Sequence, residues 1–307
     1  MSLPNKCPLC NSKSSNQTVV TPHVYGQEKG RGHSFFHCHT CDVYYQYPRL
    51  NPDEEAKFYS KEFENFMEKR AGQSGGWKKA NKHISVNEET RQRRMKYLEP
   101  YLMEKIEILE IGCSSGFMLY PLDKMGHHCV GVEPSGVFGD FLEKNGLTVY
   151  NSIEQLMNNT PDQKYDLIMH FFVLEHISDP LTFLSNLLNL LKPNGKIIFE
   201  IPNVADPLFS IYDIPSFERF YWSLAHVWYF SQKSLEYLLH ELGRPFIIQL
   251  DQRYDLSNHM NWAIEGRPGG MGKFSELLGS KLENNYKQNL IEMGKCDTLI
   301  GIISNEQ

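Results

Sequence analysis

The sequence predicts an α/β fold: an open, largely parallel sheet preceded by a small cysteine-bearing module. Apolar segments of strand length alternate with helical segments, which is the pattern of a parallel sheet. The first of these strands ends in Glu110 and opens into a turn between Gly112 and Gly116, while the next ends in Glu133. Two C-x-x-C pairs stand ahead of the sheet. A ligand crevice is therefore expected at the carboxyl ends of the strands.

Residues 1–58 are expected to form a zinc-binding module. Its two cysteine pairs, Cys7 with Cys10 and Cys38 with Cys41, are separated by 27 residues. Paired C-x-x-C turns offer thiolates at the spacing that tetrahedral zinc accepts. Because four thiolates leave no open position on the metal, we expect a structural zinc and not a catalytic one. Four free thiols are the alternative.

Residues 59–98 are expected to form a connector and a helical lid. A polar, glycine-rich stretch around Trp77 suggests a segment that closes over the active site. The helix that follows carries a basic cluster that includes Arg93 and Arg94. We interpret this cluster as a solvated helix face, with a cradle for a substrate diphosphate as the alternative.

Residues 99–307 are expected to form the sheet domain. Asp179 followed by Pro180 is typical of an N-cap and a first helical turn. About 45 residues separate the last two strands, whereas connections of ~4–6 residues are usual, so a substrate-side insertion is expected at about 253–296. The strands are expected near residues 106–111, 128–133, 147–151, 165–171, 196–201, 246–252 and 298–303.

The turn after the first strand separates two classes of cofactor. In a dinucleotide-binding G-x-G-x-x-G turn the glycines admit a pyrophosphate, but here Ser114 and Phe117 take the second and third glycine positions. Glu110 would repel a pyrophosphate, and it suits the positively charged amino group of S-adenosylmethionine. Glu133 can accept hydrogen bonds from the ribose of either cofactor. An NAD-dependent oxidoreductase is therefore the less favoured function.

Three segments, residues 110–116, 165–177 and 191–199, resemble in their order the class I S-adenosylmethionine-dependent methyltransferases. The resemblance implies a Rossmann-like, mostly parallel sheet with an antiparallel last strand. The cofactor-binding residues that it implies are Glu110, Gly112, Cys113 (as a small apolar filler), Ser114, Gly116, Glu133, Pro134, Asn151, Ser152, His170 and Phe171.

An aromatic-rich segment, residues 209–230, follows the fifth strand and should open onto the crevice. Part of it, residues 224–231, resembles the Glu-His-x-x-x-Phe-Ser stretch of sugar methyltransferases, and the cysteine module resembles the one fused to such enzymes. The resemblance implies methylation of a hydroxyl on a sugar nucleotide or glycan precursor, with His226 as the general base. Tyr221 and His176 are the other candidate catalytic residues.

Two further hypotheses concern this chemistry. Ala225 stands where sugar C-methyltransferases carry glutamate, which leaves C-methylation of a nucleotide-linked deoxysugar as an alternative only. O-methylation of another small molecule is a second alternative. We interpret Glu175 and His176 mainly as organisers of the cofactor wall, with a metal site as the other interpretation.

The composition excludes several classes of protein. With a net charge of -6 and no long basic run, a nucleic-acid partner is not expected. No apolar stretch approaches the ~20 residues of a membrane span, and the N-terminus lacks the apolar core of a signal peptide. Seven cysteines without an export signal favour a reducing cytoplasm. We expect a cytoplasmic enzyme with a small-molecule substrate, while the oligomeric state, a homo-oligomer included, stays open.

Overall fold

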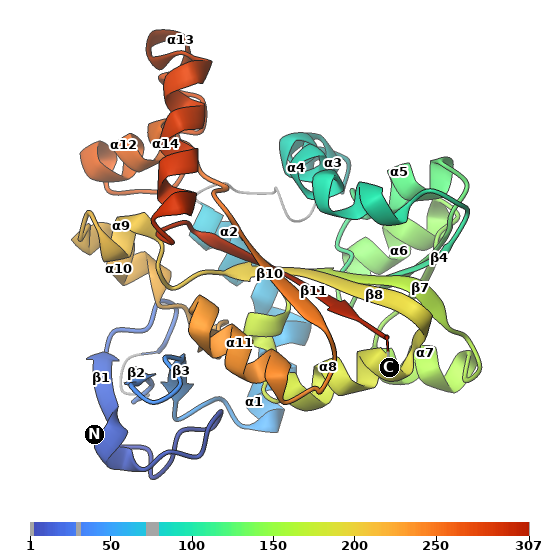
Figure 1. The fold of residues 1–307 in the computed structure, drawn as a ribbon, viewed down its shortest axis with the longest axis horizontal. Coiled ribbons are helices and arrows are strands. Elements are labelled where there is room, and N and C mark those ends of the chain that lie inside the picture. The colour runs from blue at the N-terminus through green and yellow to red at the C-terminus, as the bar shows by residue number, and fades with distance from the viewer. Residues whose placement is uncertain (1–2, 29–31, 72–79, 307) are drawn as a thin grey trace.

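The computed structural model describes residues 3–28, 32–71 and 80–306. The glycine-rich part of the expected lid, residues 72–79, lies outside the described residues. The described strands form a seven-stranded sheet of order β10-β11-β8-β7-β4-β5-β6 and a four-stranded sheet of order β1-β2-β3-β9. Both are visible in Figure 1, the larger sheet through the centre and the smaller below it.

The large sheet has the architecture that the sequence predicts. Strands β4 to β8 pair in parallel, and the last strand, β11, is antiparallel to both β8 and β10. The Rossmann-like fold class is therefore confirmed. The strands are β4 (Glu107–Ile111), β5 (His128–Val132), β6 (Thr148–Tyr150), β7 (Tyr165–Phe171), β8 (Leu191–Pro202), β10 (Phe246–Asp251) and β11 (Thr298–Ser304).

Helices cover both faces of this sheet because successive strand residues point to opposite sides. Ile168 packs with the helices on one face, and its neighbours Leu167 and Met169 pack with those on the other. Figure 1 shows the two layers. One layer holds α3 (Ala80–Val86), α4 (Glu88–Leu98), α5 (Leu119–Lys124) and α6 (Gly136–Lys144), and the other holds α7 (Ile153–Asn159), α8 (Pro180–Asn189) and α11 (Gln232–His240).

The close approach of β11 to β8 depends on a glycine. A Cβ added at Gly301 would lie 2.1 Å from the ring of Phe199, so only glycine admits that buried ring between the strands. The insertion between β10 and β11 is helical, and Gly279, which has a φ of +75°, separates its last two helices. Its helices are α12 (Leu256–Glu265), α13 (Ser275–Leu278) and α14 (Ser280–Glu292).

The small sheet joins the N-terminal segment to a distant part of the chain. Tyr44 pairs with Tyr229, and Tyr45 pairs with Trp228, so residues 228–229 complete the sheet of the cysteine module. Its strands are β1 (Gln17–Thr21), β2 (Ser34–Cys38), β3 (Tyr44–Tyr47) and β9 (Trp228–Tyr229), and the helices that follow it are α1 (Pro52–Lys57) and α2 (Phe63–Ala71), separated by a π-helical turn at Phe58–Glu62.

Arg93 and Arg94 of the basic cluster on α4 face the sheet with side chains 13% and 6% exposed, so their interpretation as part of a solvated face was wrong. Nε of Arg94 lies 2.6 Å from Glu200, a carboxylate that is fully buried in β8. Arg93 bridges Glu200 and Asp251. Burial alone would raise the pKa of Glu200, but the two guanidiniums outweigh it and lower that pKa. This ion-pair network fastens α4 to the sheet and leaves neither arginine for a diphosphate.

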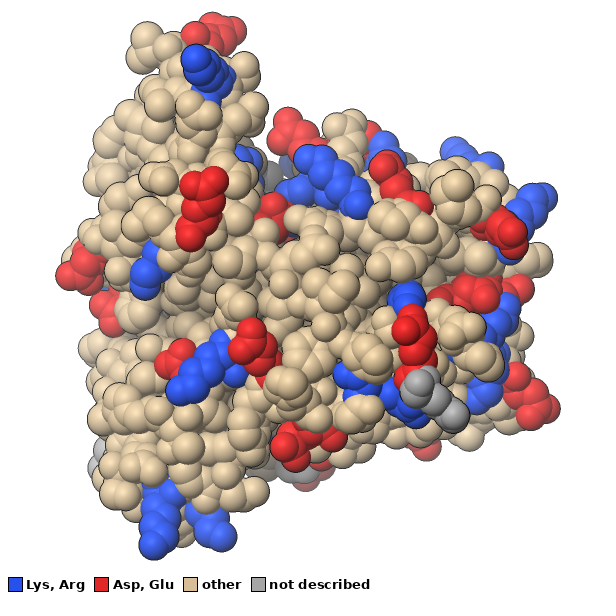
Figure 2. Space-filling model, in the orientation of Figure 1, with Lys and Arg blue, Asp and Glu red and all other residues tan. Residues whose placement is uncertain are grey.

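The surface carries charges of both signs. On the face shown in Figure 2, lysine and arginine side chains alternate with aspartate and glutamate, without a broad patch of one sign. Among the described residues, no helix combines the length and the apolar character that crossing a bilayer requires.

Candidate functional site

A cavity of ≈ 650 Å³ opens at the carboxyl ends of the central strands. The loops after β4 and β5 line one end of it, and the aromatic segment between β8 and α11 lines the other. The insertion contributes Arg253, Tyr254, Asn258 and Trp262 to the wall, and α2 contributes Met67 and Arg70. The cavity therefore has two ends. The end formed by consecutive strands is where the sequence analysis expects the cofactor, and we call it the cofactor end; the end formed by remote segments is where it expects the substrate, and we call it the acceptor end.

The turn after β4 is shaped for close approach of a ligand. Gly112 has a φ of +71°, and a Cβ there would lie 2.8 Å from Val173. Glu133 accepts hydrogen bonds from the N–H of Ser114 at 2.6 Å and of Ser135 at 2.8 Å. The carboxylate that the sequence assigned to a ribose is thus fixed beside the turn. Pro134 lies next to it in the cavity wall.

Glu110 lies beneath this turn, where it is 2% exposed. Its Oε2 finds no hydrogen-bond partner among the described residues. Burial raises the pKa of Glu110 well above its ordinary value, and the nearby Arg94 charge acts in the opposite direction. The hydroxyl of Ser114 is also buried and unpartnered within the described chain. A ligand ammonium fits this acceptor pair, whereas a pyrophosphate does not.

Two residues of the cofactor end were not predicted. Arg94 stacks on Phe171 at 4.2 Å from the ring centroid, and His83 from α3 hydrogen-bonds Ser115 at 2.9 Å. Both line the cavity. The charge pattern on α4 was visible in the sequence, but its partner Glu200 lies more than a hundred residues away, so no local signal could assign it.

Five of the predicted cofactor residues do not line the cavity. Cys113 is 1% exposed and packs under the turn, as expected of a small filler, and Gly116 packs against α5 and α6. Ser152 accepts from the N–H of Gln155 and caps α7, and the N–H of Asn151 donates to the same glutamine.

His170 is the fifth of these residues, and it belongs to the core. It is fully buried and stacks on Phe199 with ring centroids 4.9 Å apart. Burial lowers the pKa of His170 to about 3. The ring points away from the strand's cavity side because residues along a strand alternate, while the next residue, Phe171, does line the cavity.

The acceptor end brings together Glu175, His176 and His226. Their ligand atoms lie within 4.8 Å of one another. Nδ1 of His176 lies 2.7 Å from the carbonyl oxygen of Ala225, a contact in which it acts as donor and which leaves Nε2 as the basic nitrogen. Nδ1 of His226 and both oxygens of Glu175 are buried and unpartnered within the described ranges. The trio can serve proton transfer, and it also has the composition of a cation site.

Burial sets the protonation of this trio. It raises the pKa of Glu175 to about 8 and lowers the pKa of His176 to about 4. Burial, the neighbouring His176 and the charge of Arg70 all lower the pKa of His226 well below its ordinary value. Both imidazoles are therefore neutral at pH 7, which is the state required of a base.

Tyr221 lies at the same end with its hydroxyl already engaged. The O–H donates to the carbonyl of Asn203 at 3.1 Å, and the ring is 6% exposed. Phe217 and Phe220 extend this wall, each 5.1 Å from the ring of Trp262. The predicted aromatic segment is thus partly core and partly cavity lining.

The four N-terminal cysteines converge as the sequence predicts. Sγ of Cys7 lies 3.8 Å from Sγ of Cys41, and Sγ of Cys10 lies 3.6 Å from Sγ of Cys38. A tetrahedron with Zn–S bonds of ≈ 2.3 Å has S···S edges of about 3.8 Å, so the spacing fits zinc. The N–H of Leu9 also points at Sγ of Cys7, 3.4 Å away.

Comparison with known proteins supplies independent findings. The family profile described as "Methyltransferase domain" matches residues 67–244. A "Ubiquinone biosynthesis O-methyltransferase" of Cereibacter sphaeroides is 30% identical over 104 residues, covering 32% of this chain and 42% of the relative. A protein of the same name from Coxiella burnetii is 31% identical over 116 residues, covering 36% and 50%. The chain thus spans about half, or less, of these relatives.

Among solved structures, a SAM-dependent methyltransferase from Archaeoglobus fulgidus aligns with a TM-score of 0.50. It is 19% identical, and the match covers 79% of this chain and 100% of that one, so it bears on the fold alone. The curated relatives contradict the expectation of a sugar-nucleotide or glycan-precursor acceptor, because their names place O-methylation in ubiquinone biosynthesis. That expectation rested on the residues 224–231 and on the cysteine module, neither of which defines an acceptor.

Proposed function

Because the chain belongs to the methyltransferase-domain family and is an S-adenosylmethionine-dependent methyltransferase, we propose that it methylates a hydroxyl group of a small molecule. His226 is the general base in this proposal. The observation that carries it is a neutral imidazole in the cavity wall whose Nδ1 is buried and has no partner in the described chain. The names of the O-methyltransferase relatives support a hydroxyl as the acceptor group.

The residues of the cofactor end fit the donor. Glu133, which the turn holds in place, would bind the ribose. Glu110 and Ser114 would bind the amino group, because Oε2 of Glu110 and Oγ of Ser114 are buried and have no partner in the described structure. S-adenosylmethionine supplies a methyl group on a positively charged sulfur, which leaves as a neutral thioether. Phe171 and Phe117 exclude water beside it.

The chain's own contribution to the reaction is proton transfer and alignment. The hydroxyl group of the acceptor gives its proton to His226. The acceptor oxygen forms the new bond to the methyl carbon as the bond between that carbon and the sulfur breaks. His176 is fixed by its bond to Ala225 and lies beside His226, with ring centroids 4.9 Å apart. We assign Tyr221 a wall role, because its hydroxyl is bound to Asn203.

Three structural elements belong to the same proposal. Residues 1–58 form a module held by a structural zinc on Cys7, Cys10, Cys38 and Cys41, supported by the sulfur spacing. Residues 59–98 form the connector and lid, and residues 99–307 form the catalytic domain with its insertion at about 253–296. A cytoplasmic location follows from the need to keep these thiols reduced.

Calorimetry and mass spectrometry test the function. The protein should bind S-adenosylmethionine and S-adenosylhomocysteine but not NAD. Incubation with S-adenosylmethionine and a panel of small phenols and catechols should add one methyl group to at least one hydroxyl. Binding of NAD without S-adenosylmethionine would overturn the proposal, as would methyl transfer to nitrogen or carbon acceptors only.

A further inference from the structure

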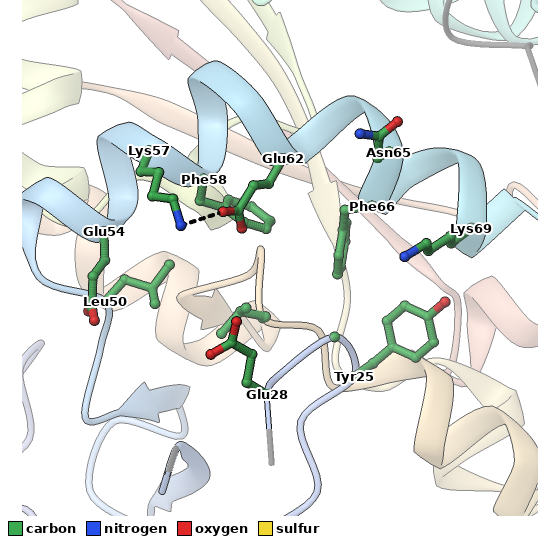
Figure 3. Close-up of a pocket in the computed structure, with 12 residues that line it drawn as sticks. Tyr25, Glu28, Leu50, Glu54, Lys57, Phe58, Glu62, Asn65, Phe66 and Lys69 are labelled. Atoms are coloured by element: carbon green, nitrogen blue, oxygen red, sulfur yellow. Dashed lines mark ion pairs between the residues drawn. The ribbon is translucent and has the colours of Figure 1, made fainter. Parts of the chain in front are cut away.

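Helix α2 lies between two cavities, and each cavity is lined by a different face of the helix. Asn65, Phe66 and Lys69 face a smaller cavity of ≈ 380 Å³, which Figure 3 shows between α2 and the segment that carries Tyr25. Phe63, Met67 and Arg70 line the catalytic cavity instead. Phe63 and Met67 are four residues apart, and Met67 and Arg70 are three apart, so these three side chains lie on one face of the helix. Arg70 is therefore aimed at the acceptor end by the geometry of its helix.

The guanidinium of Arg70 is packed but not paired. It lies 4.3 Å from the centroid of Phe220 and 5.7 Å from that of Tyr25. Its NH1 is buried and has no hydrogen-bond partner within residues 3–28, 32–71 and 80–306. A buried guanidinium donor that lacks an acceptor is costly, so this atom requires a partner that the described chain does not provide.

The other arginines of the cavity are compensated by acids. Arg94 is ion-paired with Glu200. Arg253 lies over Phe172, 4.9 Å from the ring centroid, and its charge acts on the carboxylates Glu175, Glu200 and Asp297. No ion pair of Arg70 with a carboxylate occurs in the described part of the chain. Arg70 is thus the cavity arginine whose neighbours are aromatic rings and imidazoles.

Arg70 belongs to the acceptor end and not to the cofactor end. Its charge acts to lower the pKa of Tyr229, against the larger effect of burial, and the ring of Tyr229 lies 5.0 Å from that of His226. Its charge lowers the pKa of His176 and of His226, whereas the cation that acts on Glu110 is Arg94. A ligand group bound to Arg70 would therefore lie near the two histidines.

We propose that the methyl acceptor carries an oxyanion, a carboxylate or a phosphate, which Arg70 binds while Phe220 and Trp262 contact an adjoining planar group. The inference rests on the proposed function and names the class of its substrate. Arginine suits both anions because its planar donors match two oxygens at once. The aromatic wall favours a ring between the anion and the hydroxyl.

Binding of simple probes to the protein saturated with S-adenosylhomocysteine tests this inference. Benzoate and phenyl phosphate are the anionic probes, and methyl benzoate is the neutral counterpart. Wild-type protein should bind at least one anion roughly 10-fold or more tighter than the ester, since a charge-assisted bond is at stake. The anion that binds more tightly indicates whether the methyl acceptor carries a carboxylate or a phosphate. Arg70→Gln should remove the preference, and Arg70→Lys should restore part of it.

Two control variants make the result decisive. Arg253→Gln tests a second cavity arginine and should keep the preference, as should Arg267→Gln on the exposed insertion. The inference would be overturned if wild type bound the anions and the ester equally well. It would also be overturned if Arg70→Gln kept the preference for the anion, or if Arg253→Gln lost that preference while Arg70→Gln kept it. If S-adenosylhomocysteine binds normally in all variants, such a failure leaves the methyltransferase function standing. Failure to bind S-adenosylhomocysteine would instead defeat the proposed function.

Discussion

The two ends of the catalytic cavity are built in different ways. Most of the cofactor end comes from one contiguous stretch, β4 to β5, in which Gly112 and Glu133 are 21 positions apart, and the preceding helices add His83 and Arg94. The acceptor end gathers α2, the turn after β7, the aromatic segment before β9 and the insertion after β10. The comparison teaches that the donor site is a local property of the chain, whereas the acceptor site is a property of the tertiary structure. Disturbing remote elements should therefore damage acceptor binding first.

The cysteine module offers the strongest way to break this contrast. Its strand β3 pairs with β9, and the N–H of Gln46 donates to the carbonyl of Val227 at 2.9 Å, one residue from His226. The N–H of Val227 in turn donates to the carbonyl of Glu175 at 2.8 Å. The module is thus bonded directly to the segment that carries the proposed base.

Cys38→Ser together with Cys41→Ser should destabilise the protein by about 5 kcal/mol or more, because metal binding energy is folding energy in such modules. Thermal unfolding and metal analysis measure the loss. Trp228 fluorescence should change while S-adenosylhomocysteine binding weakens less than acceptor binding. Cys129→Ser, remote from the cluster in β5, is the matched thiol control. Unchanged Trp228 emission in a zinc-free variant would contradict the coupling.

The proposed base gives the next largest effect. His226→Ala should lower kcat by ~10²–10⁴-fold, the usual contribution of a general base, with little change in S-adenosylmethionine affinity. Because the pKa of His226 lies well below its ordinary value, wild-type turnover should stay flat as the pH falls from 7 to 6, a range in which Glu175, with a pKa of about 8, also stays mostly protonated. Rapid-quench kinetics across that range provide the measurement.

A cation on Glu175, His176 and His226 would give a different outcome. EDTA would then abolish turnover, and added Mg²⁺ would restore it, contrary to the general-base assignment. His128→Ala, an exposed imidazole at the start of β5, is the control for nonspecific loss of a histidine.

Much of the cofactor end could be predicted from the sequence because its signals are local. Glycines at positions of positive φ, acids at strand ends and alternating apolar segments report on neighbours a few residues away, and Gly112, Glu110 and Glu133 lie where expected. His170 was assigned to the cofactor site, but its side chain lies in the core. Successive residues of a strand point to opposite faces of the sheet, so an error of one residue assigns a side chain to the wrong face.

The assembly of the acceptor end could not be predicted for a physical reason. The pairing of β3 with β9 joins Tyr44 to Tyr229, which are 185 positions apart in the sequence. No period or spacing in the sequence encodes such contacts. The chemical type of His226 was readable, but its neighbours Arg70, Glu175 and Tyr229 come from three separate segments.

A substitution at the cofactor end should weaken cofactor binding and leave acceptor binding unchanged. Glu133→Ala should weaken S-adenosylmethionine binding about 100-fold, since it removes a charged acceptor and two bonds that fix the turn. Calorimetry measures the affinity. The anionic probes should bind the variant as they bind wild type. Asp140→Ala, an exposed acid on α6, should leave both affinities unchanged.

The smallest expected effect concerns Glu175, where the two ends meet. Burial raises the pKa of this carboxyl to about 8, above its unfolded value, so the folded state favours the protonated form. The stability that this provides is complete below the unfolded pKa and is lost as the pH rises towards 8. The glutamine side chain in the Glu175→Gln variant does not titrate. Its stability relative to wild type should therefore increase by about 1 kcal/mol between pH 5 and pH 6, measured by denaturant unfolding at each pH. Glu154→Gln, an exposed acid on α7, should show no such trend. A difference between Glu175→Gln and wild type that stays constant with pH would mean that the carboxyl is already ionised in the folded protein, and that a cation at the acceptor end compensates it.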